Sequence, residues 1–309
     1  MSTLQYLLPK KLLTQLAGAF ASARAGAATQ FAIRRFIARY GVNMAEAANA
    51  DPGSYSTFNE FFTRPLRDGA RPLSEADFVC PVDGAISQLG PITGRAGDVI
   101  YQAKGHTYST TALVGGDVAL AKKFEHGHFA TIYLSPKDYH RIHMPCDGEL
   151  RRMIYVPGTL YSVNPATARE VAGLFAINER VVCVFDTPHG PFVNVLVGAT
   201  IVGSMATVWH GVVNPRDREG KIPQHGNYLV ERPEHAFHVI PPKEPPYLEV
   251  REWDYKSGEV VLKKGDEMGR FLLGSTVVML WPKDTIRFNE AWRPEGPVRM
   301  GEAMGARIA

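Results

Sequence analysis

Hydrophobic residues in the larger part of this chain occur in short runs that are separated by Gly, Pro and Asp. Short β-branched and aromatic runs bounded by such turn residues are typical of strands. We therefore predict a β-rich body between residues 79 and 280. Its expected strands lie at 79–82, 131–134, 150–156, 181–185, 192–200, 259–262 and 271–280.

Helical spacing dominates the N-terminus instead. Apolar residues recur every four positions from Leu8 to Phe20, and a second set follows over 32–40. This spacing predicts two short amphipathic helices that join near Gly26. Residues 54–64 predict another short helix, which begins at a Ser or Thr cap and ends before Pro65.

Charge sets the same N-terminal region apart from the body. The whole chain has a net charge of only +3, but residues 1–44 contain no acidic residue. A helix that is apolar on one side and purely cationic on the other is typical of an anionic membrane interface. We predict membrane contact there; the alternative is a helical lid with its basic residues in solvent. The basic residues are Lys10, Lys11, Arg24, Arg34, Arg35 and Arg39.

Composition narrows the classes of protein to consider. With 45% hydrophobic and 21% charged residues, the chain is globular and long enough for one large domain or two. It has no run of 18 apolar residues, so no spanning helix is predicted. Cys80, Cys146 and Cys183 fit neither a zinc pattern nor a disulfide framework, and we expect buried thiols. A phosphate loop and a dinucleotide motif are both missing, and no nucleic-acid partner is expected.

The most unusual pair is Gly274-Ser275, inside the apolar run 271–280. Glycine weakens a strand interior and marks a bulge or a close approach of the backbone. A serine here places a hydroxyl beside a carbonyl that no side chain shields, so Ser275 Oγ could attack the carbonyl of Gly274. The alternative is a bulge that contains an ordinary buried serine.

Two histidines form a second candidate site. His140 and His143 would share one side of a helical turn that must end before Pro145. A histidine pair beside Asp138 and Tyr139 favours acid–base chemistry. His-x-x-His without a glutamate lacks the pattern of a zinc protease, so we predict no metal.

Asp83 is the third candidate. Asp83-Gly84 after an apolar run signals a turn, and the functional alternative is a carboxylate at a strand end that orients a base. Ser275, a histidine and an aspartate together would supply a nucleophile, a base and its orienter. Ser275 lacks the Gly-x-Ser-x-Gly elbow of a serine hydrolase, which favours attack on its own backbone.

Together these motifs resemble the bacterial membrane-bound type of phosphatidylserine decarboxylase. The resemblance runs from about Leu4 to Leu280, and several spaced motifs in the right order make it specific. Residues 212–256 carry no matched site, and the polar tail after Lys283 is predicted to fray. The matching segments are 58–66, 83–84, 102–106, 139–145, 178–180, 196–204 and 273–276.

The resemblance implies an α+β fold in which N-terminal amphipathic helices precede a β-rich catalytic body that cleaves itself. His143 would remove the Ser275 hydroxyl proton while Asp83 fixes the imidazole. Cleavage between Gly274 and Ser275 would give a β chain, 1–274, and an α chain, 275–309. Within the β chain, residues 1–44 would associate with the membrane and 45–274 would form the body. Ser275 would become a covalent pyruvoyl group, with neither a metal nor pyridoxal phosphate.

The implied activity is decarboxylation of phosphatidylserine to phosphatidylethanolamine and CO2, a step of phospholipid biosynthesis. The pyruvoyl ketone would form a Schiff base with the substrate amine, and His140 would be the proton donor. The implied enzyme is peripheral, on the cytoplasmic face of the cell membrane, where it meets phosphatidylserine in an anionic bilayer. Its αβ heterodimer would assemble further into homo-oligomers.

Three other functions stay open from the residues alone. A Ser-His-Asp lipid hydrolase would use the same residue types but keep one intact chain. A non-enzymatic membrane-surface protein would need only residues 1–44 and would tolerate loss of the Ser275 hydroxyl. A pyruvoyl decarboxylase for a soluble amino acid would be cleaved in the same way without needing an amphipathic N-terminus.

Overall fold

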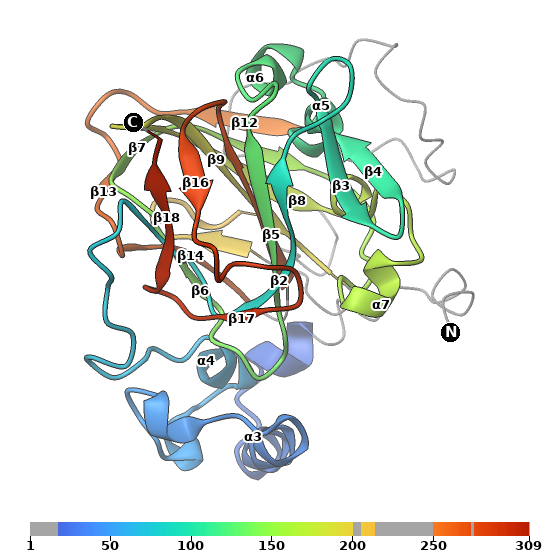
Figure 1. Cartoon of the computed structure of the whole chain (residues 1–309). Helices are drawn as coiled ribbons and strands as arrows, with labels where there is room; N and C mark the ends of the chain where they lie inside the picture. The colour runs from blue at the N-terminus through green and yellow to red at the C-terminus, as the bar shows by residue number, and fades with distance from the viewer. Residues whose placement is uncertain (1–17, 200–204, 214–249, 273–274, 309) are drawn as a thin grey trace.

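The computed structural model describes residues 18–199, 205–213, 250–272 and 275–308 (Figure 1). A sheet-rich body carries few helices, which confirms a mixed α+β architecture. The body is built on a nine-stranded sheet whose neighbouring strands run antiparallel. In spatial order its strands are β12 (Arg251–Asp254), β7 (Gly148–Val156), β8 (Arg180–Thr187), β9 (Gly190–Val197), β15 (Ser275–Trp281), β5 (His128–Leu134), β2 (Gly84–Pro91) and β17 (Pro297–Val298), with β13 (Val261–Leu262) beside β7.

Smaller sheets complete the body. One has the order β11 (Gly211–Val212), β10 (Met205–Thr207), β14 (Glu267–Phe271) and β6 (Arg141–His143). Another has the order β1 (Phe78–Val79), β18 (Ala303–Arg307) and β16 (Ile286–Phe288). β3 (Val99–Ala103) and β4 (His106–Ser109) form a separate hairpin.

The central strand β15 begins at Ser275. Ser275 pairs with Leu134 of β5, and on the other edge Thr276 pairs with Val197 of β9. All of its side chains are buried, which explains why the sequence shows a continuous apolar run rather than an alternating one. The strand therefore holds the start of the predicted α chain in the middle of the main sheet.

The prediction of one strand over 271–280 is wrong. Phe271 ends β14 and pairs with Met205 in the four-stranded sheet, whereas Ser275 belongs to the nine-stranded sheet. The chain thus changes sheets between 271 and 275, and Ser275 is the first residue of its strand rather than part of a strand interior. Residues 273–274 lie outside the described part of the chain.

The helices are short except for one. α3 (Ala27–Tyr40) covers the second predicted N-terminal helix, while the first lies mostly in 1–17, outside the described residues. α4 (Phe58–Phe62) confirms the helix that was predicted to end before Pro65. The remaining helices are η1 (Met44–Glu46), η2 (Pro52–Ser54), α5 (Thr110–Leu113), α6 (Val118–Lys122), α7 (Pro165–Ala168) and α8 (Leu174–Ile177).

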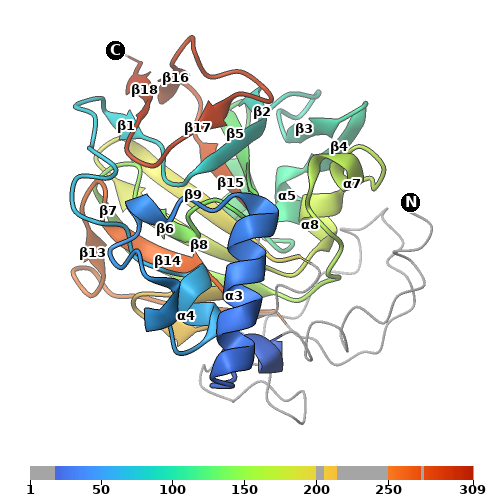
Figure 2. The same cartoon turned by 90° about the horizontal axis from the view of Figure 1, so that it is seen from below.

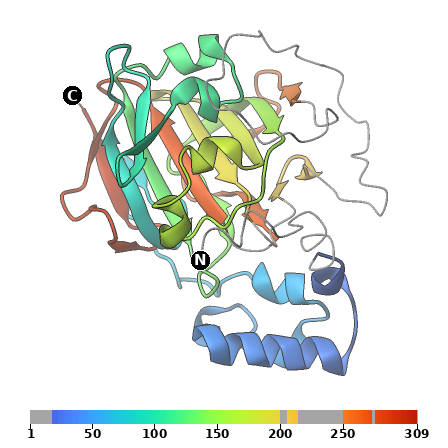
Figure 3. The same ribbon diagram turned by 90° about the vertical axis from the view of Figure 1, so that its right-hand side faces the viewer.

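α3 lies on the lower side of the body together with α4 (Figure 3), and the view from below places α3 in front of the sheets (Figure 2). The Phe36 ring of α3 contacts the α4 rings of Phe58, Phe61 and Phe62, with ring centroids 5.1 to 6.0 Å apart. Of the described helices, none combines the length and apolar character needed to cross a membrane.

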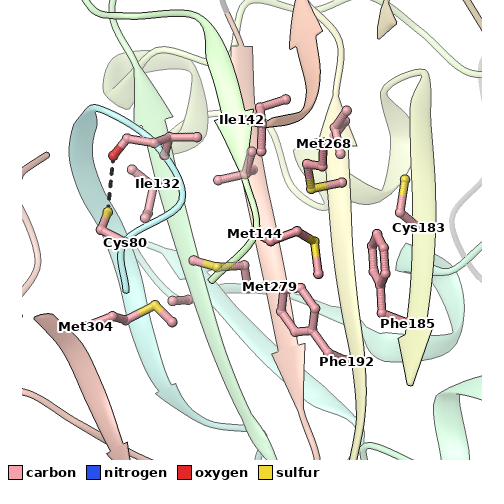
Figure 4. Packing of buried hydrophobic residues seen from close by; sticks show 14 of the residues in the cluster. Cys80, Ile132, Ile142, Met144, Cys183, Phe185, Phe192, Met268, Met279 and Met304 are labelled. Atoms are coloured by element: carbon pink, nitrogen blue, oxygen red, sulfur yellow. Dashed lines mark hydrogen bonds between the residues drawn. The ribbon is translucent and has the colours of Figure 1, made fainter. Parts of the chain in front are cut away.

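The main core lies between the sheets (Figure 4) and is rich in sulfur. Met144, Met268 and Met279 are fully buried there, and all three cysteines are free and buried, as predicted. Cys80 Sγ lies 3.1 Å from the carbonyl oxygen of Val82. The core thus reaches the segment that carries Asp83.

The prediction that the tail frays after Lys283 is wrong. β18 pairs with both β1 and β16, and β17 pairs with β2. Ile286 and Met304 are fully buried in the main core. Burial of these two side chains and strand pairing order a segment whose average composition is polar.

Candidate active site

Ser275 is a buried hydroxyl without a visible partner. Its side chain is 0% exposed, and Oγ forms no hydrogen bond with the described residues. Leaving a buried hydroxyl unpaired costs about 1–3 kcal/mol, so such a group calls for an explanation. Chemistry at this hydroxyl is one such explanation. The predicted target, Gly274, lies outside the described residues.

His140 lies directly before β6 and is fully buried against Phe62, with the ring centroids 4.0 Å apart. Its Nδ1 lies 2.8 Å from the carbonyl oxygen of Asp138. A carbonyl oxygen can only accept a hydrogen bond, so Nδ1 of His140 must carry the proton. Nε2 therefore has a lone pair. Nε2 has no partner among the described residues. Burial lowers the pKa of His140 to about 3, against the opposing effect of the Asp138 hydrogen bond.

His143 is held at both ring nitrogens. Nδ1 donates to the carbonyl oxygen of Gly265 at 2.8 Å, and Nε2 accepts from the Tyr139 hydroxyl at 3.0 Å. Burial lowers the pKa of His143, while the Gly265 hydrogen bond and then the charges of Glu267 and Asp83 act to raise it. His143 is therefore a neutral base whose lone pair is occupied by a phenol.

The prediction of a helical turn for the two histidines is wrong, because Arg141–His143 is strand β6. β6 pairs with β14, which draws this segment into an extended conformation. Residues of a strand alternate between its faces, so the two imidazoles do not share one side. This accounts for their different hydrogen-bond partners.

Asp83 directly precedes β2 and accepts hydrogen bonds from two sources. Arg71 Nε donates to Oδ1 at 2.9 Å, and the backbone N–H of Met300 donates to the same oxygen at 2.9 Å. Arg71 also binds Glu46 at 2.8 Å. A guanidinium fork is a strong carboxylate partner, and it takes the place that the sequence assigned to an imidazole. The predicted hydrogen bond from His143 to Asp83 is therefore not formed in this structure.

The backbone nevertheless brings the three predicted segments together. The N–H of His143 donates to the carbonyl oxygen of Pro81 at 2.9 Å. The N–H of Phe271 donates to the carbonyl oxygen of His140 at 3.0 Å. The histidine segment thus lies beside both the segment that carries Asp83 and the end of β14, four residues before Ser275, although these are far apart along the chain.

A polar cavity of about 260 Å³ opens beside this site. Asp83, Asp138 and Tyr139 line it, together with Arg64 and Arg71, to which sequence reasoning assigned no role. Both arginines directly precede a proline, but that pattern does not reveal their burial. Within the described ranges, no group of three or more His, Cys, Asp or Glu side chains is placed to hold a metal ion.

Comparison with known proteins gives consistent matches over almost the whole chain. A family model described as phosphatidylserine decarboxylase matches residues 58–306, and one described as PSD matches residues 2–41. A phosphatidylserine decarboxylase proenzyme of Azoarcus sp. (strain BH72) is 63% identical over 301 residues, which cover 97% of this chain and 93% of the relative. The proenzyme of Dechloromonas aromatica (strain RCB) is 62% identical over 98% of this chain and 96% of its own. That of Delftia acidovorans (strain DSM 14801 / SPH-1) is 60% identical, with the same two coverages.

Proposed function

The chain belongs to the phosphatidylserine decarboxylase family, and from this membership we propose how its residues carry out the two reactions of such a proenzyme. The enzyme decarboxylates phosphatidylserine to phosphatidylethanolamine and CO2, a step of phospholipid biosynthesis. It is made as a proenzyme that is cleaved into a pair of chains. The assignment of sites and residue roles that follows is our proposal.

Cleavage takes place between Gly274 and Ser275. Ser275 Oγ attacks the Gly274 carbonyl carbon, and the amide is converted to an ester. Elimination releases chain 1–274 with its new carboxylate, and hydrolysis of the remaining dehydroalanine releases ammonia and leaves a pyruvoyl group on chain 275–309. The observation that carries this proposal is the buried, unpartnered Oγ at the first residue of the central strand, just past the change of sheets.

His143 is the proposed base for this step. Its Nε2 takes the Ser275 proton once the Tyr139 hydroxyl releases that nitrogen. Gly265 holds the ring orientation through Nδ1, and Asp83 acts through its charge, which favours the imidazolium that forms. Asp83, His143 and Ser275 thus act as a triad in which Asp83 works without a direct hydrogen bond in the starting state.

The position of Ser275 suits a covalent pyruvoyl group, because it is fully buried and β15 is anchored on both edges. The pyruvoyl group supplies a ketone that condenses with the substrate amine and accepts the electron pair left as CO2 departs. His140 is the proposed proton carrier. Its free Nε2 takes a proton from the substrate ammonium and returns it to the carbon that has lost CO2.

The N-terminal region is the proposed contact with the anionic bilayer, on the cytoplasmic face of the cell membrane. Phe31 of α3 is 72% exposed and the preceding Phe20 is 50% exposed. An open apolar groove between them includes Arg35 and Arg39 at its margin. Exposed aromatic rings beside arginines are what a peripheral helix presents to an anionic interface.

The test is an intact mass measurement of the purified protein beside its Ser275→Ala variant. We expect the wild type to split after Gly274, with chain 275–309 lighter than a serine-started peptide by one ammonia. The variant should stay whole, because it lacks the nucleophile. Cleavage of both proteins at this site would refute the role of Ser275. Two whole proteins, with activity blocked by a serine-directed reagent, would instead support the lipid hydrolase.

A further inference from the structure

Arg64 is a buried cation at the wall of the cavity. It follows α4, whose start is fixed by reciprocal caps between the segment 56–57 and Glu60. Arg64 is 4% exposed, and its guanidinium carbon lies 5.4 Å from the centre of the Phe61 ring. Because α4 and the following Pro65 fix the backbone on both sides, the guanidinium is held at the cavity wall.

The hydrogen bonds of Arg64 are few and long. Nη1 donates to the carbonyl oxygen of Phe61 and Nη2 to that of Lys137, both at 3.4 Å. Nε has no partner among the described residues, and none of their carboxylates forms an ion pair with Arg64. A guanidinium carries five N–H donors, so most of its hydrogen-bonding capacity is unused.

Other buried or half-buried arginines of the body have short hydrogen bonds or ion pairs. Arg180 donates to three backbone carbonyls at 2.6 to 2.8 Å. Arg71 binds both Asp83 and Glu46, and Arg141 binds Glu267 at 2.7 Å. Arg64 is thus as buried as Arg180 but has weaker partners than any of these three arginines.

The carboxylates that line the cavity are committed to other groups. Asp138 accepts from the backbone N–H and the hydroxyl of Ser135, both at 2.7 Å. Asp83 and Glu46 are held by Arg71. The cavity thus presents a buried guanidinium that forms no ion pair with a carboxylate of the described residues. Burial lowers the pKa of Arg64, which reflects the cost of keeping this charge out of water.

We propose that Arg64 binds the phosphodiester of the phosphatidylserine headgroup in this cavity. This inference rests on the proposed function. The planar fork of arginine fits two oxygens of a phosphate, and the ion pair would replace the missing partners of the buried cation. A bound phosphodiester would position the headgroup for the reaction without taking part in it.

The substrate carries a second anion, the carboxylate, but catalysis disfavours placing that group on Arg64. Charge leaves the carboxylate as CO2 forms, so an arginine bound to it would stabilise the ground state more than the transition state. The phosphodiester keeps its charge throughout the reaction. Binding it strengthens substrate affinity without opposing the chemical step.

The position of Arg64 agrees with placing the phosphodiester at Arg64 and the reacting carbon near His140. Phe62, two residues earlier, packs its ring against the His140 ring. The positive charge of Arg64 is also close enough to His140 to contribute to the lowering of its pKa. In phosphatidylserine a single methylene group separates the phosphodiester from the carbon that loses CO2. The proposal thus has one headgroup extend from Arg64 toward His140.

The first test measures binding to the full-length, uncleaved Ser275→Ala protein by calorimetry. Glycerophosphoethanolamine carries the phosphodiester without the carboxylate, and serine carries the carboxylate without the phosphate. We expect Arg64→Met to weaken binding of glycerophosphoethanolamine by about tenfold or more, and Arg64→Lys to weaken it less. Serine binding that depends on Arg64 would overturn the assignment, and so would unchanged glycerophosphoethanolamine binding. Inorganic phosphate that binds as tightly as the diester would indicate a free-phosphate site and would also overturn it.

The second test separates binding from a structural role. Arg64→Met replaces an unpaired cation by an apolar side chain, so we expect the Tm to stay the same or rise. Arg180→Met is the matched control, and it should lower the Tm because three buried carbonyls lose their donor. An equal fall for both variants would show that Arg64 is structural and would overturn the proposal.

The kinetic test distinguishes this inference from the proposed function. In cleaved protein, Arg64→Lys should raise KM for phosphatidylserine while kcat changes little. A wild type that fails to decarboxylate phosphatidylserine would refute the proposed function itself. A wild type that is active, with an Arg64→Lys variant of unchanged KM, would refute the role of Arg64 alone.

Discussion

At the scale of single residues, the site contains two imidazoles that differ in whether the Nε2 lone pair is already hydrogen-bonded. Nε2 of His140 has no hydrogen-bond partner in the described part of the chain, whereas Nε2 of His143 accepts from Tyr139. Sequence reasoning identified both histidines, but their tautomers depend on Asp138 and Gly265 carbonyls that no motif encodes. Local sequence can therefore name the bases of this site but not their protonation.

Burial of His140 should make stability depend on pH. The pKa of His140 is about 3 in the folded protein and near 6.5 when the chain is unfolded. Between these values the unfolded chain binds more protons, so the free energy of unfolding falls as the pH drops below 6.5. One such group contributes a slope of up to about 1.4 kcal/mol per pH unit.

The measurement is urea unfolding of the uncleaved Ser275→Ala protein from pH 7 to pH 4. His140→Asn removes the titrating group and should flatten the slope over this range. Equal slopes for the parent protein and His140→Asn would show that His140 does not titrate as stated.

The Tyr139 hydroxyl should restrain self-cleavage. Tyr139→Phe removes the donor to His143 Nε2 and frees its lone pair for the Ser275 proton. A hydrogen bond of this kind is worth about 0.5–1.5 kcal/mol, so we expect cleavage about two- to tenfold faster. Time-resolved mass measurement of newly made protein gives the rate, and slower cleavage would show that the hydroxyl assists the reaction.

The charge of Asp83 should matter more for cleavage than that of Glu46, although both bind Arg71. Asp83→Asn keeps the shape but removes one of the charges that favour the His143 imidazolium, so cleavage should slow, by up to about tenfold if that charge is worth about one pKa unit. Glu46→Gln is the matched control, because it weakens the same arginine pair but leaves Asp83 charged. Similar rates in the two variants would assign the effect to Arg71 rather than to Asp83.

At the scale of elements, the sequence predicted the features that depend on neighbouring residues, such as the bounds of helix α4. Thr57 and Glu60 cap α4, and the helix ends before Arg64 as the following proline requires. The break between β14 and β15 could not be predicted from the sequence. The two parts of the apolar run 271–280 pair with strands of two different sheets, and these partners are far away along the chain. β16 and β18 were missed for the same reason, since their partners lie far away along the chain.

This sheet topology predicts that the two chains stay together after cleavage. β15 pairs with β5 and β9, β17 with β2, and β18 with β1, so chain 275–309 is paired with the β chain along its length. We expect cleaved protein to elute as one αβ unit in gel filtration and to separate only in denaturant. A free small chain under native conditions would contradict this pairing.

At the scale of the whole molecule, the candidate site joins residues that are distant in the sequence, and Asp83, Asp138, Arg64 and Arg71 line one cavity beside it. The spaced motifs of the sequence single out Asp83 and Ser275 as candidates, and their catalytic roles stay a prediction. Arg64 and Arg71 could not be assigned from the sequence, because their roles depend on burial and on partners that only the fold brings near. From the sequence alone, an arginine is expected to lie on the surface, as most arginines do.

The arrangement of the molecule also predicts which face meets the membrane. α3 lies at the lower side of the body and α6 at the top (Figure 1). Phe31 of α3 and Val118 of α6 are both highly exposed, at 72% and 61%.

Inserting the Phe31 ring into a bilayer would contribute about 1.5–3 kcal/mol, so Phe31→Ser should weaken binding to anionic liposomes about tenfold or more. Val118→Ser removes an exposed apolar side chain from the opposite side and should leave sedimentation with liposomes unchanged. An equal loss of liposome binding in both variants would mean that general surface hydrophobicity, rather than α3, determines binding. If both variants keep full binding, a helical lid would be favoured over a membrane contact.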